Sequence, residues 1–191
     1  MIKVCIATSK DAQEISELRK TAYKQCTGSI IRNYDFLKWD EKDDKSTILY
    51  IKDSSGNFVS TIRSQVFYSK EALEKHLDIV INEPISFPVA VLERAATLTS
   101  HRRKGHTALL RLLLVALLPT EVNHVVCTIQ EDASRVEFLK GAGYKVTTAD
   151  LSKRVVQASS FKNSSLVLFG YLNRELFHRL IEETIHKSTL P

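Results

Sequence analysis

The sequence predicts an α/β protein, because segments typical of strands and helices alternate along its length. Two local patterns support this most directly. The segment Asp53-Ser54-Ser55-Gly56-Asn57 separates two apolar runs and is typical of a hairpin turn. Ala90 to Leu118 passes from a strand-like run through a short basic loop into an apolar segment of helical length, which Pro119 ends. A chain of 191 residues is long enough for one core, so we expect one domain over 1–191.

The elements are predicted in order from hydrophobic periodicity and from residues that begin or end helices. Strands are expected at 3–8, 46–52, 58–67, 90–98, 124–130, 144–151 and 164–172. Helices are expected from a cap at Ser9 or Asp11 to about Gln25, over 71–78 and 107–118, from a cap at Asp132 or Ser134 to Gly141 or Gly143, and over about 174–187. The aromatic and charged segment 27–44 is expected to be a long loop or a broken helix.

The composition is that of a globular protein and disfavours several functional classes. Hydrophobic residues make up 43% and charged residues 26% of the chain, which excludes a disordered or fibrous protein. The net charge of +5 is modest, and the positive residues are dispersed apart from Arg102 to Lys104. We therefore expect no nucleic-acid partner. The longest apolar run, Leu112 to Leu118, is too short to span a bilayer, so we expect no membrane association and a cytoplasmic location.

Cysteine and histidine spacing predicts no metal site. Cys5, Cys26 and Cys127 are far apart, and no set of His, Cys, Asp and Glu residues has the spacing of metal ligands. His106 is expected at a helix N-terminus, where the positive local field disfavours its protonation. His101 is expected to pack beside the same loop.

The basic loop between Thr99 and Gly105 predicts a phosphate site. It joins a strand to a helix N-terminus, where unpaired backbone N–H groups and the helix dipole favour an anion. Arg102, Arg103 and Lys104 add positive charge, and Gly105 would allow a ligand to approach the backbone closely. The expected ligand is a phosphate or pyrophosphate.

Two segments resemble the GCN5-related N-acetyltransferase (GNAT) superfamily. The loop Arg102-Arg103-Lys104-Gly105-His106-Thr107 resembles its pyrophosphate-binding pattern [Q/R]-x-x-G-x-[G/A], and Phe138 to Tyr144 resembles its "fYexxGF" helix end. The resemblance implies a mixed, mostly antiparallel six- to seven-stranded sheet flanked by helices, with strands four and five splayed around the cofactor's pantetheine arm. It also implies acetyl-CoA or another acyl-CoA as acyl donor, with the arm along Ala95, Ala96 and Thr97 and the pyrophosphate on Arg103 to Ala108. Thr107 departs from the pattern, which prefers Gly or Ala there.

The same resemblance leaves catalysis only partly assigned. The usual strand-four base position is Val91, which cannot accept a proton, and Glu93 lies two residues further along the strand. Glu93 is therefore the candidate base, and an ion pair with Arg63 or with a lysine is the structural alternative. The usual acid is a Tyr, and its position is Leu139. Either the thiolate leaves unassisted, or a residue such as His101 substitutes, or the protein is a weak catalyst.

A second, looser resemblance concerns acyl-homoserine lactone synthases and N-acyl amino acid synthases, which take acyl chains from acyl carrier protein. It rests on the spacing of six residues, namely Arg19, Trp39, Asp40, Asp43, Arg63 and Arg94. Packing of the Trp39 ring on the core is the alternative for that residue.

The sequence thus leaves three hypotheses. The first is an N-acyltransferase that passes an acetyl or short acyl group from acyl-CoA to a primary amine, on a small molecule or a peptide, by direct attack. The second is a catalytically silent member of the fold that binds acyl-CoA or a partner protein. The third is an acyl-carrier-protein-dependent synthase. Assembly as a homodimer stays open.

Overall fold

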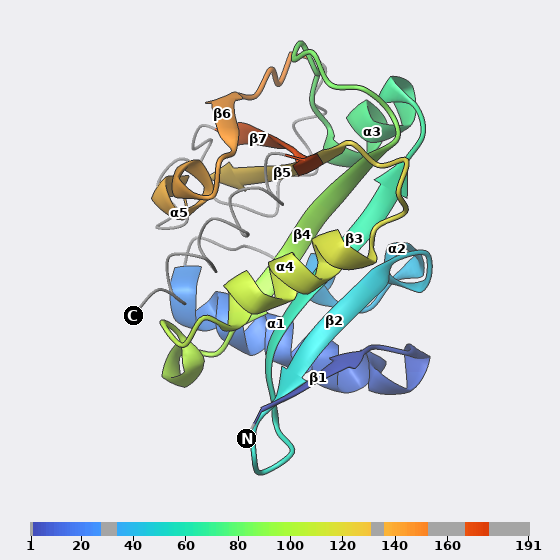
Figure 1. Ribbon diagram of the computed structural model, residues 1–191. Helices are drawn as coiled ribbons and strands as arrows, with labels where there is room; N and C mark the ends of the chain where they lie inside the picture. Colours follow the sequence, from blue (N-terminus) through green and yellow to red (C-terminus); the bar gives the residue numbers. More distant parts are fainter. Residues whose placement is uncertain (1, 28–33, 131–135, 153–166, 176–191) are drawn as a thin grey trace. The chain divides into compact units, whose positions relative to one another are not determined.

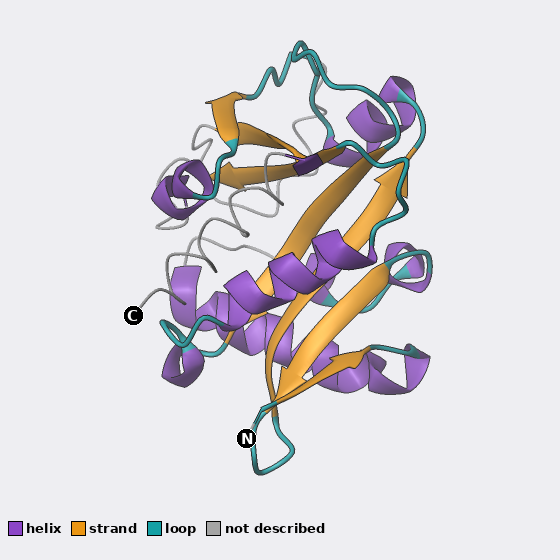
Figure 2. Cartoon of the chain, viewed as in Figure 1, coloured by secondary structure: helices purple, strands orange, loops and turns teal. Residues whose placement is uncertain are grey.

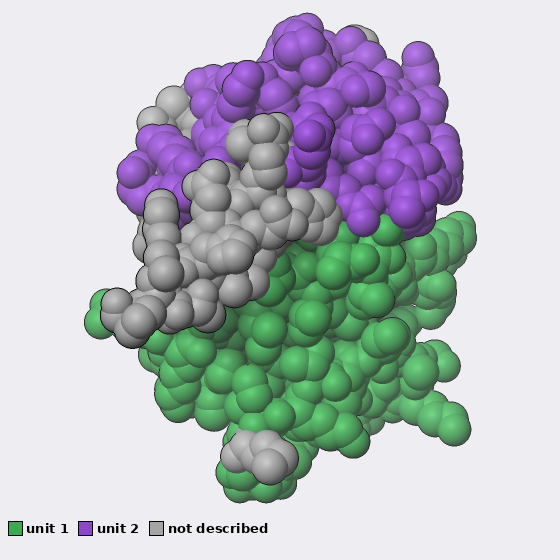
Figure 3. Space-filling view, in the orientation of Figure 1, with its two compact units in different colours: residues 1–65, 92–118, 156–164 green, residues 66–91, 119–155, 165–191 purple. Residues whose placement is uncertain are grey.

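The structure, a computed structural model, describes residues 2–27, 34–130, 136–152 and 167–175. These residues fall into two compact units (Figure 3). The first contains 1–65 and 92–118, and the second contains 66–91 together with the described residues after Leu118. Each unit is described by itself below.

The elements follow one another as Figure 1 shows. The strands are β1 (Lys3–Ile6), β2 (Thr47–Lys52), β3 (Phe58–Phe67), β4 (Val89–Thr97), β5 (His124–Gln130), β6 (Lys145–Thr148) and β7 (Val167–Asn173). The α-helices are α1 (Ala12–Thr27), α2 (Glu41–Asp44), α3 (Lys70–Leu77), α4 (His106–Leu117) and α5 (Val136–Gly141). Three single 3-10 turns, η1 (Ser9–Asp11), η3 (Asp35–Leu37) and η4 (Thr99–His101), connect them.

The strands form a seven-stranded mixed sheet in the order β1-β2-β3-β4-β5-β7-β6. The β1/β2, β2/β3, β5/β7 and β6/β7 pairs are antiparallel. The β4/β5 pair is parallel and runs from Val89↔His124 to Val91↔Val126. The mixed, mostly antiparallel sheet flanked by helices is therefore confirmed (Figure 2).

In the first unit, helices cover both faces of β3. Ile15, Leu18 and Ala22 form the buried stripe of α1, as their spacing predicts. The Ser60 hydroxyl is hydrogen-bonded to that of Thr97, which is hydrogen-bonded in turn to Thr107 of α4. The Arg63 guanidinium donates to Asp43 of α2. Residues an odd number apart point to opposite faces of a strand, so α4 and α2 lie on opposite sides of β3.

Trp39 packs on the core of the first unit. Its ring lies against the buried cluster of Ile15, Ile48 and Tyr50. Its indole Nε1 donates to Asp44 Oδ1 at 2.7 Å, and its backbone N–H donates to Ser16 Oγ at 2.9 Å. These contacts explain the tryptophan structurally, as the packing alternative expects.

The second unit has a separate apolar core. Its buried cluster consists of Phe67, Leu73, Ile79, Ile81, Val89, Val91, Val126, Ala149 and Phe169. Leu139 and Tyr144 are also buried, and the Tyr144 N–H donates to the Leu139 carbonyl just after α5. Both residues are therefore core residues of this unit.

Most predicted boundaries agree with the structure to within a few residues. The largest difference is β6, which spans four residues where eight were expected, with Leu151 packed against the apolar core instead. In the segment 27–44, where a long loop or a broken helix was expected, the described residues contain the short η3 and α2. Asp40 caps α2 by accepting from the N–H groups of Lys42 and Asp43. The predicted caps at Asp132 and Ser134 and most of the predicted C-terminal helix lie outside the described residues.

Candidate functional site

The loop between β4 and α4 turns sharply at two residues of positive φ. Arg103 has φ +60°, and Gly105, the residue that caps α4, has φ +76°. Gly reaches this region at little cost, whereas other residues seldom adopt it. Both turns lie between the end of η4 and the first residue of α4.

The backbone N–H groups of this loop are free to bind a ligand. The first helical bond of α4 runs from Leu109 N–H to the Gly105 carbonyl at 2.9 Å. Within the described part of the chain, the N–H groups of residues 103–108 donate to no protein acceptor. Six such donors beside the positive end of a helix dipole are the arrangement that binds phosphate groups. Free N–H groups, which an anion site at this loop requires, are thus present in the backbone, and the site itself stays a prediction.

Gly105 leaves open space at this site. A Cβ atom built on Gly105 would meet no atom of the described residues within 4 Å. The space that a larger side chain would occupy there is therefore not filled by any of these residues. A ligand can approach the loop backbone through this space.

Arg102 differs from the two basic residues that follow it. Its guanidinium donates to the carbonyls of Thr97 at 3.4 Å and Ala22 at 3.3 Å, which ties the loop to β4 and α1. Arg103 and Lys104 are exposed. All three residues were expected to contribute positive charge to an anion site, whereas Arg102 also has contacts within the fold.

This difference predicts unequal effects of three alanine substitutions on acyl-CoA binding. Arg103→Ala and Lys104→Ala should each weaken binding about two- to tenfold at low ionic strength and less at high ionic strength, because salt screens exposed charges. Arg102→Ala should also lower the melting temperature. Calorimetric titration at two salt concentrations measures the first effect, with the exposed Lys42→Ala as control. A loss that does not depend on salt for Lys104→Ala would contradict an electrostatic role.

Thr107 has a structural partner at the position where the GNAT pattern prefers Gly or Ala. Its Oγ1 lies 2.9 Å from Thr97 Oγ1, which lies 2.8 Å from Ser60 Oγ. This chain of hydroxyl groups joins α4 to β4 and β3. The hydroxyl of Thr107 is thus directed toward the sheet, where it does not crowd the free N–H groups.

Two histidines lie together at the start of α4. The His101 and His106 rings are stacked with centroids 5.9 Å apart. Burial lowers the pKa of His106 below its ordinary value, and the charges of His101 and Lys104 lower it further. The predicted direction is confirmed, but burial is a larger cause than the positive field on which the prediction relied.

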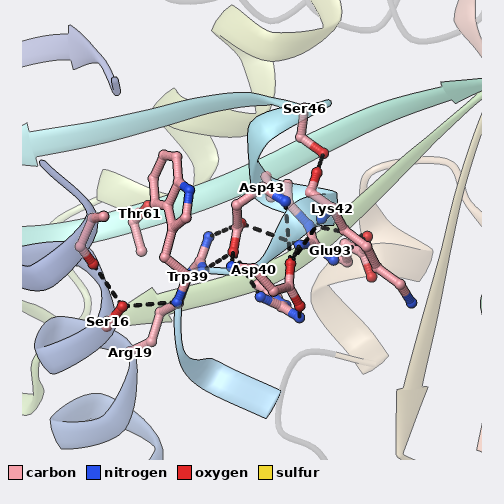
Figure 4. A network of polar contacts seen from close by, with 12 residues as sticks. Ser16, Arg19, Trp39, Asp40, Lys42, Asp43, Ser46, Thr61 and Glu93 are labelled. Atoms are coloured by element: carbon pink, nitrogen blue, oxygen red, sulfur yellow. Dashed lines mark hydrogen bonds and ion pairs between the residues drawn. The ribbon is translucent and has the colours of Figure 1, made fainter. Parts of the chain in front are cut away.

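A buried network of charges lies on the face of β3 opposite α4 (Figure 4). Asp43 accepts from both terminal nitrogens of Arg19 at 2.9 Å, in the bidentate geometry favoured by guanidinium and carboxylate groups. Arg63 Nη1 also donates to Asp43, at 3.1 Å. The side chains of all three residues are almost completely buried. Five of the six residues behind the second resemblance belong to this network, and Trp39 packs beside it.

Glu93 and Arg94 both enter this network although they are adjacent in a strand. Glu93 Oε1 accepts from Arg63 Nη2 at 2.7 Å and from Nε at 3.1 Å. Arg94 donates to Asp43 Oδ2 at 2.8 Å and to Asp40 Oδ2 at 2.6 Å. Neighbouring side chains of a regular strand point to opposite faces, but Arg94 has φ +52°. The irregular backbone at Arg94 explains how both side chains reach one cluster.

The ion pair that the sequence analysis gave as the alternative role of Glu93 is therefore present. Both hydrogen bonds from Arg63 go to the same oxygen of the Glu93 carboxylate. A pKa shift in this network is shown at Asp40. Burial alone would raise its pKa, but the hydrogen bond and charge of Arg94 hold that pKa below its ordinary value.

Asp43 is the carboxylate shared by three guanidinium groups, which predicts a large effect on stability. Asp43→Asn removes the buried negative charge opposite Arg19, Arg63 and Arg94 and should lower the free energy of unfolding by about 3–5 kcal/mol. Chemical denaturation measures this loss. Asp44→Asn, the same substitution at the exposed neighbouring residue, should change stability by less than about 1 kcal/mol. Equal effects of the two substitutions would show that the network contributes no stability of its own.

The structure also bears on three other features: a side-chain acid, a metal site and a membrane-spanning helix. Leu139, at the position of the usual acid, is an apolar core residue and offers no proton. Among the described residues, no group of His, Cys, Asp and Glu is arranged to hold a metal ion, and no helix is long and apolar enough to cross a membrane. Sequence reasoning missed the stacking of His101 on His106 and the irregular backbone at Arg94, for which the sequence contains no local signal.

Comparison with known proteins identifies the fold. No family profile matches the sequence, and a search of curated proteins finds no match. Solved structures do match. A GNAT-family acetyltransferase from Staphylococcus aureus Mu50 superposes with a TM-score of 0.64 at 11% identity, covering 91% of this chain and 99% of its own. The ribosomal-protein-S18-alanine N-acetyltransferase of Escherichia coli gives 0.59 at 13% identity, covering 91% and 94%.

An N-acyl amino acid synthase from uncultured soil microbes, FeeM, is also similar, with a TM-score of 0.62 at 10% identity over 94% of each chain. The protein therefore has the fold of the GNAT acyltransferases. The recognised resemblance is confirmed at the level of the fold, which acetyltransferases and an N-acyl amino acid synthase share.

Proposed function

We propose that this protein is an N-acyltransferase that transfers an acetyl or short acyl group from acyl-CoA to a primary amine. The observation that supports this most is the loop of residues 103–108, whose free N–H groups lie at the start of α4 next to exposed Arg103 and Lys104. This arrangement suits the diphosphate of coenzyme A. Ala95, Ala96 and Thr97 precede the loop on β4, where the pantetheine arm would lie.

The proposed reaction is a direct attack on the thioester. The amine lone pair forms a bond to the carbonyl carbon, the carbonyl electrons move onto oxygen, and their return breaks the carbon–sulfur bond. Before the attack, Glu93 takes a proton from the ammonium form of the amine, directly or through a water molecule, and later releases it to solvent. After the attack the nitrogen loses its second proton to solvent, and the thiolate takes a proton from solvent. We assign no side-chain acid, because Leu139 cannot act as one.

The arginine pair of Glu93 sets a condition on this mechanism. Arg63 donates two hydrogen bonds to Glu93 Oε1, so the amine must approach a carboxylate that a guanidinium already holds. The base contributes while the amine still carries the proton that must be removed before it can attack. An amine that arrives deprotonated depends less on Glu93.

A second candidate is supported by the charged network. The spacing of Arg19, Asp40, Asp43, Arg63 and Arg94 resembles that of acyl-homoserine lactone and N-acyl amino acid synthases, and all five lie in one connected cluster. This favours an acyl-carrier-protein-dependent enzyme of the N-acyl amino acid or homoserine lactone synthase kind. The third candidate, a silent acyl-CoA-binding protein, is supported by the lack of an acid at Leu139.

One assay separates the three candidates. Acetyl-CoA binding is measured by calorimetry, and thiol release is then followed with a panel of amines, using acyl-CoA and acyl carrier protein loaded with the same acyl group. The proposal predicts micromolar-range binding and amine-dependent thiol release from acyl-CoA. Binding without release would favour the silent protein, and release only from acyl carrier protein would favour the second candidate.

A further inference from the structure

The start of α4 contains an imidazole that the proposed reaction does not use. His106 is the first residue of α4 and only 6% of its surface is exposed. Its Nδ1 is buried and has no hydrogen-bond partner among the described residues. A buried ring nitrogen without a partner is costly, and the cost is larger if the ring is charged. In the free protein the imidazole is therefore held in its neutral form.

The charged groups around His106 reinforce the neutral form. The His101 ring stacks on it from η4, and the charges of His101 and Lys104 both lower the pKa of His106. The guanidinium of Arg102, in the same loop, donates to the carbonyls of Thr97 and Ala22. The residues next to these histidines contact neutral groups: the Thr107 hydroxyl lies against that of Thr97 of β4, and the Thr99 N–H donates to the Gln25 amide of α1. Among the described residues, the carboxylate of Asp53 interacts with His101.

We propose that His106 takes up a proton when the diphosphate of the acyl donor binds at the start of α4, so that donor affinity rises as pH falls. This inference rests on the proposed function, because the ligand is the donor's diphosphate. The N–H groups that would hold the phosphates belong to residues 103–108, and His106 lies within that segment. The anion would supply the negative charge that the surroundings of the ring lack.

The size of the effect follows from Coulomb's law. One negative charge at about 5 Å in an effective dielectric constant of about 20 favours the protonated imidazole by roughly 200- to 300-fold. Burial and its basic neighbours lower the pKa of His106 in the free protein, and the bound anion acts in the opposite direction. Between the two pKa values the dissociation constant should fall by up to about tenfold per unit decrease in pH. Above both values it should not depend on this group.

Calorimetry in buffers of different ionisation enthalpy measures the proton directly. The probe is acetyl-dephospho-CoA, because its diphosphate has no ionisation near neutral pH and its thiol is blocked, whereas the 3′-phosphate of CoA titrates near pH 6. We expect net uptake of up to one proton per molecule bound, which is largest at a pH between the pKa values of His106 in the free protein and in the complex. His106→Asn, which keeps a polar atom near the Nδ1 position, should bind the probe with little or no uptake.

His101→Gln is the matched control, because it removes the stacked imidazole and leaves His106 in place. Uptake that persists in His101→Gln and disappears in His106→Asn supports the proposal. Binding without uptake in the wild-type protein overturns it, and so does uptake that only His101→Gln removes. Absence of binding to both acetyl-CoA and the dephospho probe would instead overturn the proposed function itself.

A measurement on the wild-type protein avoids reliance on any variant. NMR titration of the His106 ring with and without the probe should show a higher pKa in the complex. An equal or lower pKa in the complex overturns the proposal even if His106→Asn does not fold.

Discussion

Gly105→Val should abolish acyl-CoA binding. The valine side chain would occupy the open space above the loop, where the diphosphate must approach the N–H groups of residues 103–108. It would also favour a change in the loop backbone, since a β-branched residue is poorly tolerated at φ +76°. Calorimetric titration with acetyl-CoA should show no detectable heat of binding at concentrations that saturate the wild-type protein.

Gly56→Val is the matched control for this substitution. Gly56 has φ +84°, and its Cβ would also meet nothing within 4 Å. It lies in the hairpin turn between β2 and β3, where its N–H donates to the Asp53 carbonyl. Both substitutions should cost about 1–2 kcal/mol of stability or somewhat more. Only Gly105→Val should lose the ligand, and unchanged acetyl-CoA affinity in Gly105→Val would remove the anion site from this loop.

The parts of the fold that the sequence predicted are those determined by neighbouring residues. The turn at 53–57 is held by Asp53, whose carboxylate accepts from Ser55 and Asn57 N–H groups, and such local bonds are visible in a sequence. The free N–H groups of residues 103–108 can be predicted in the same way, because Gly105 marks the start of α4 and the first N–H groups of a helix have no partner within it. The predicted loop geometry is therefore a consequence of local chemistry.

The charged network depends on residues far apart in the chain. Arg19 meets Asp43 across 24 positions, and Arg94 meets Asp43 across 51. Sequence reasoning alone could propose these partners only through a likeness to known enzymes. Regular strand alternation placed Glu93 on the same face of the strand as Val91. The positive φ of Arg94 interrupts this alternation at the next residue, which could not be predicted from the sequence. Backbone irregularity of this kind is imposed by tertiary contacts, here the two carboxylates that bind the Arg94 guanidinium.

Glu93→Gln should separate a catalytic role from a structural one. Glutamine keeps the shape of the side chain and an oxygen that can accept from Arg63, but it cannot accept a proton from the amine. If Glu93 is the base, the rate at saturating substrate should fall by about 10²–10⁴-fold, the usual contribution of a positioned acid–base group. The affinity for acetyl-CoA should barely change. The loss should shrink as pH rises, because more of the amine is then already deprotonated.

The ion pair with Arg63 means that Glu93→Gln should also lower the melting temperature, so a lower activity is not sufficient by itself. Asp40→Asn controls for this effect, because Asp40 also pairs with Arg63 and with Arg94 in the same network. Asp40→Asn should lower the melting temperature and leave the rate per folded molecule close to that of the wild type. If both variants are destabilised and both are fully active, Glu93 is a structural partner of Arg63. The protein would then have no assigned base, and acyl transfer would depend on amines that reach the thioester already deprotonated.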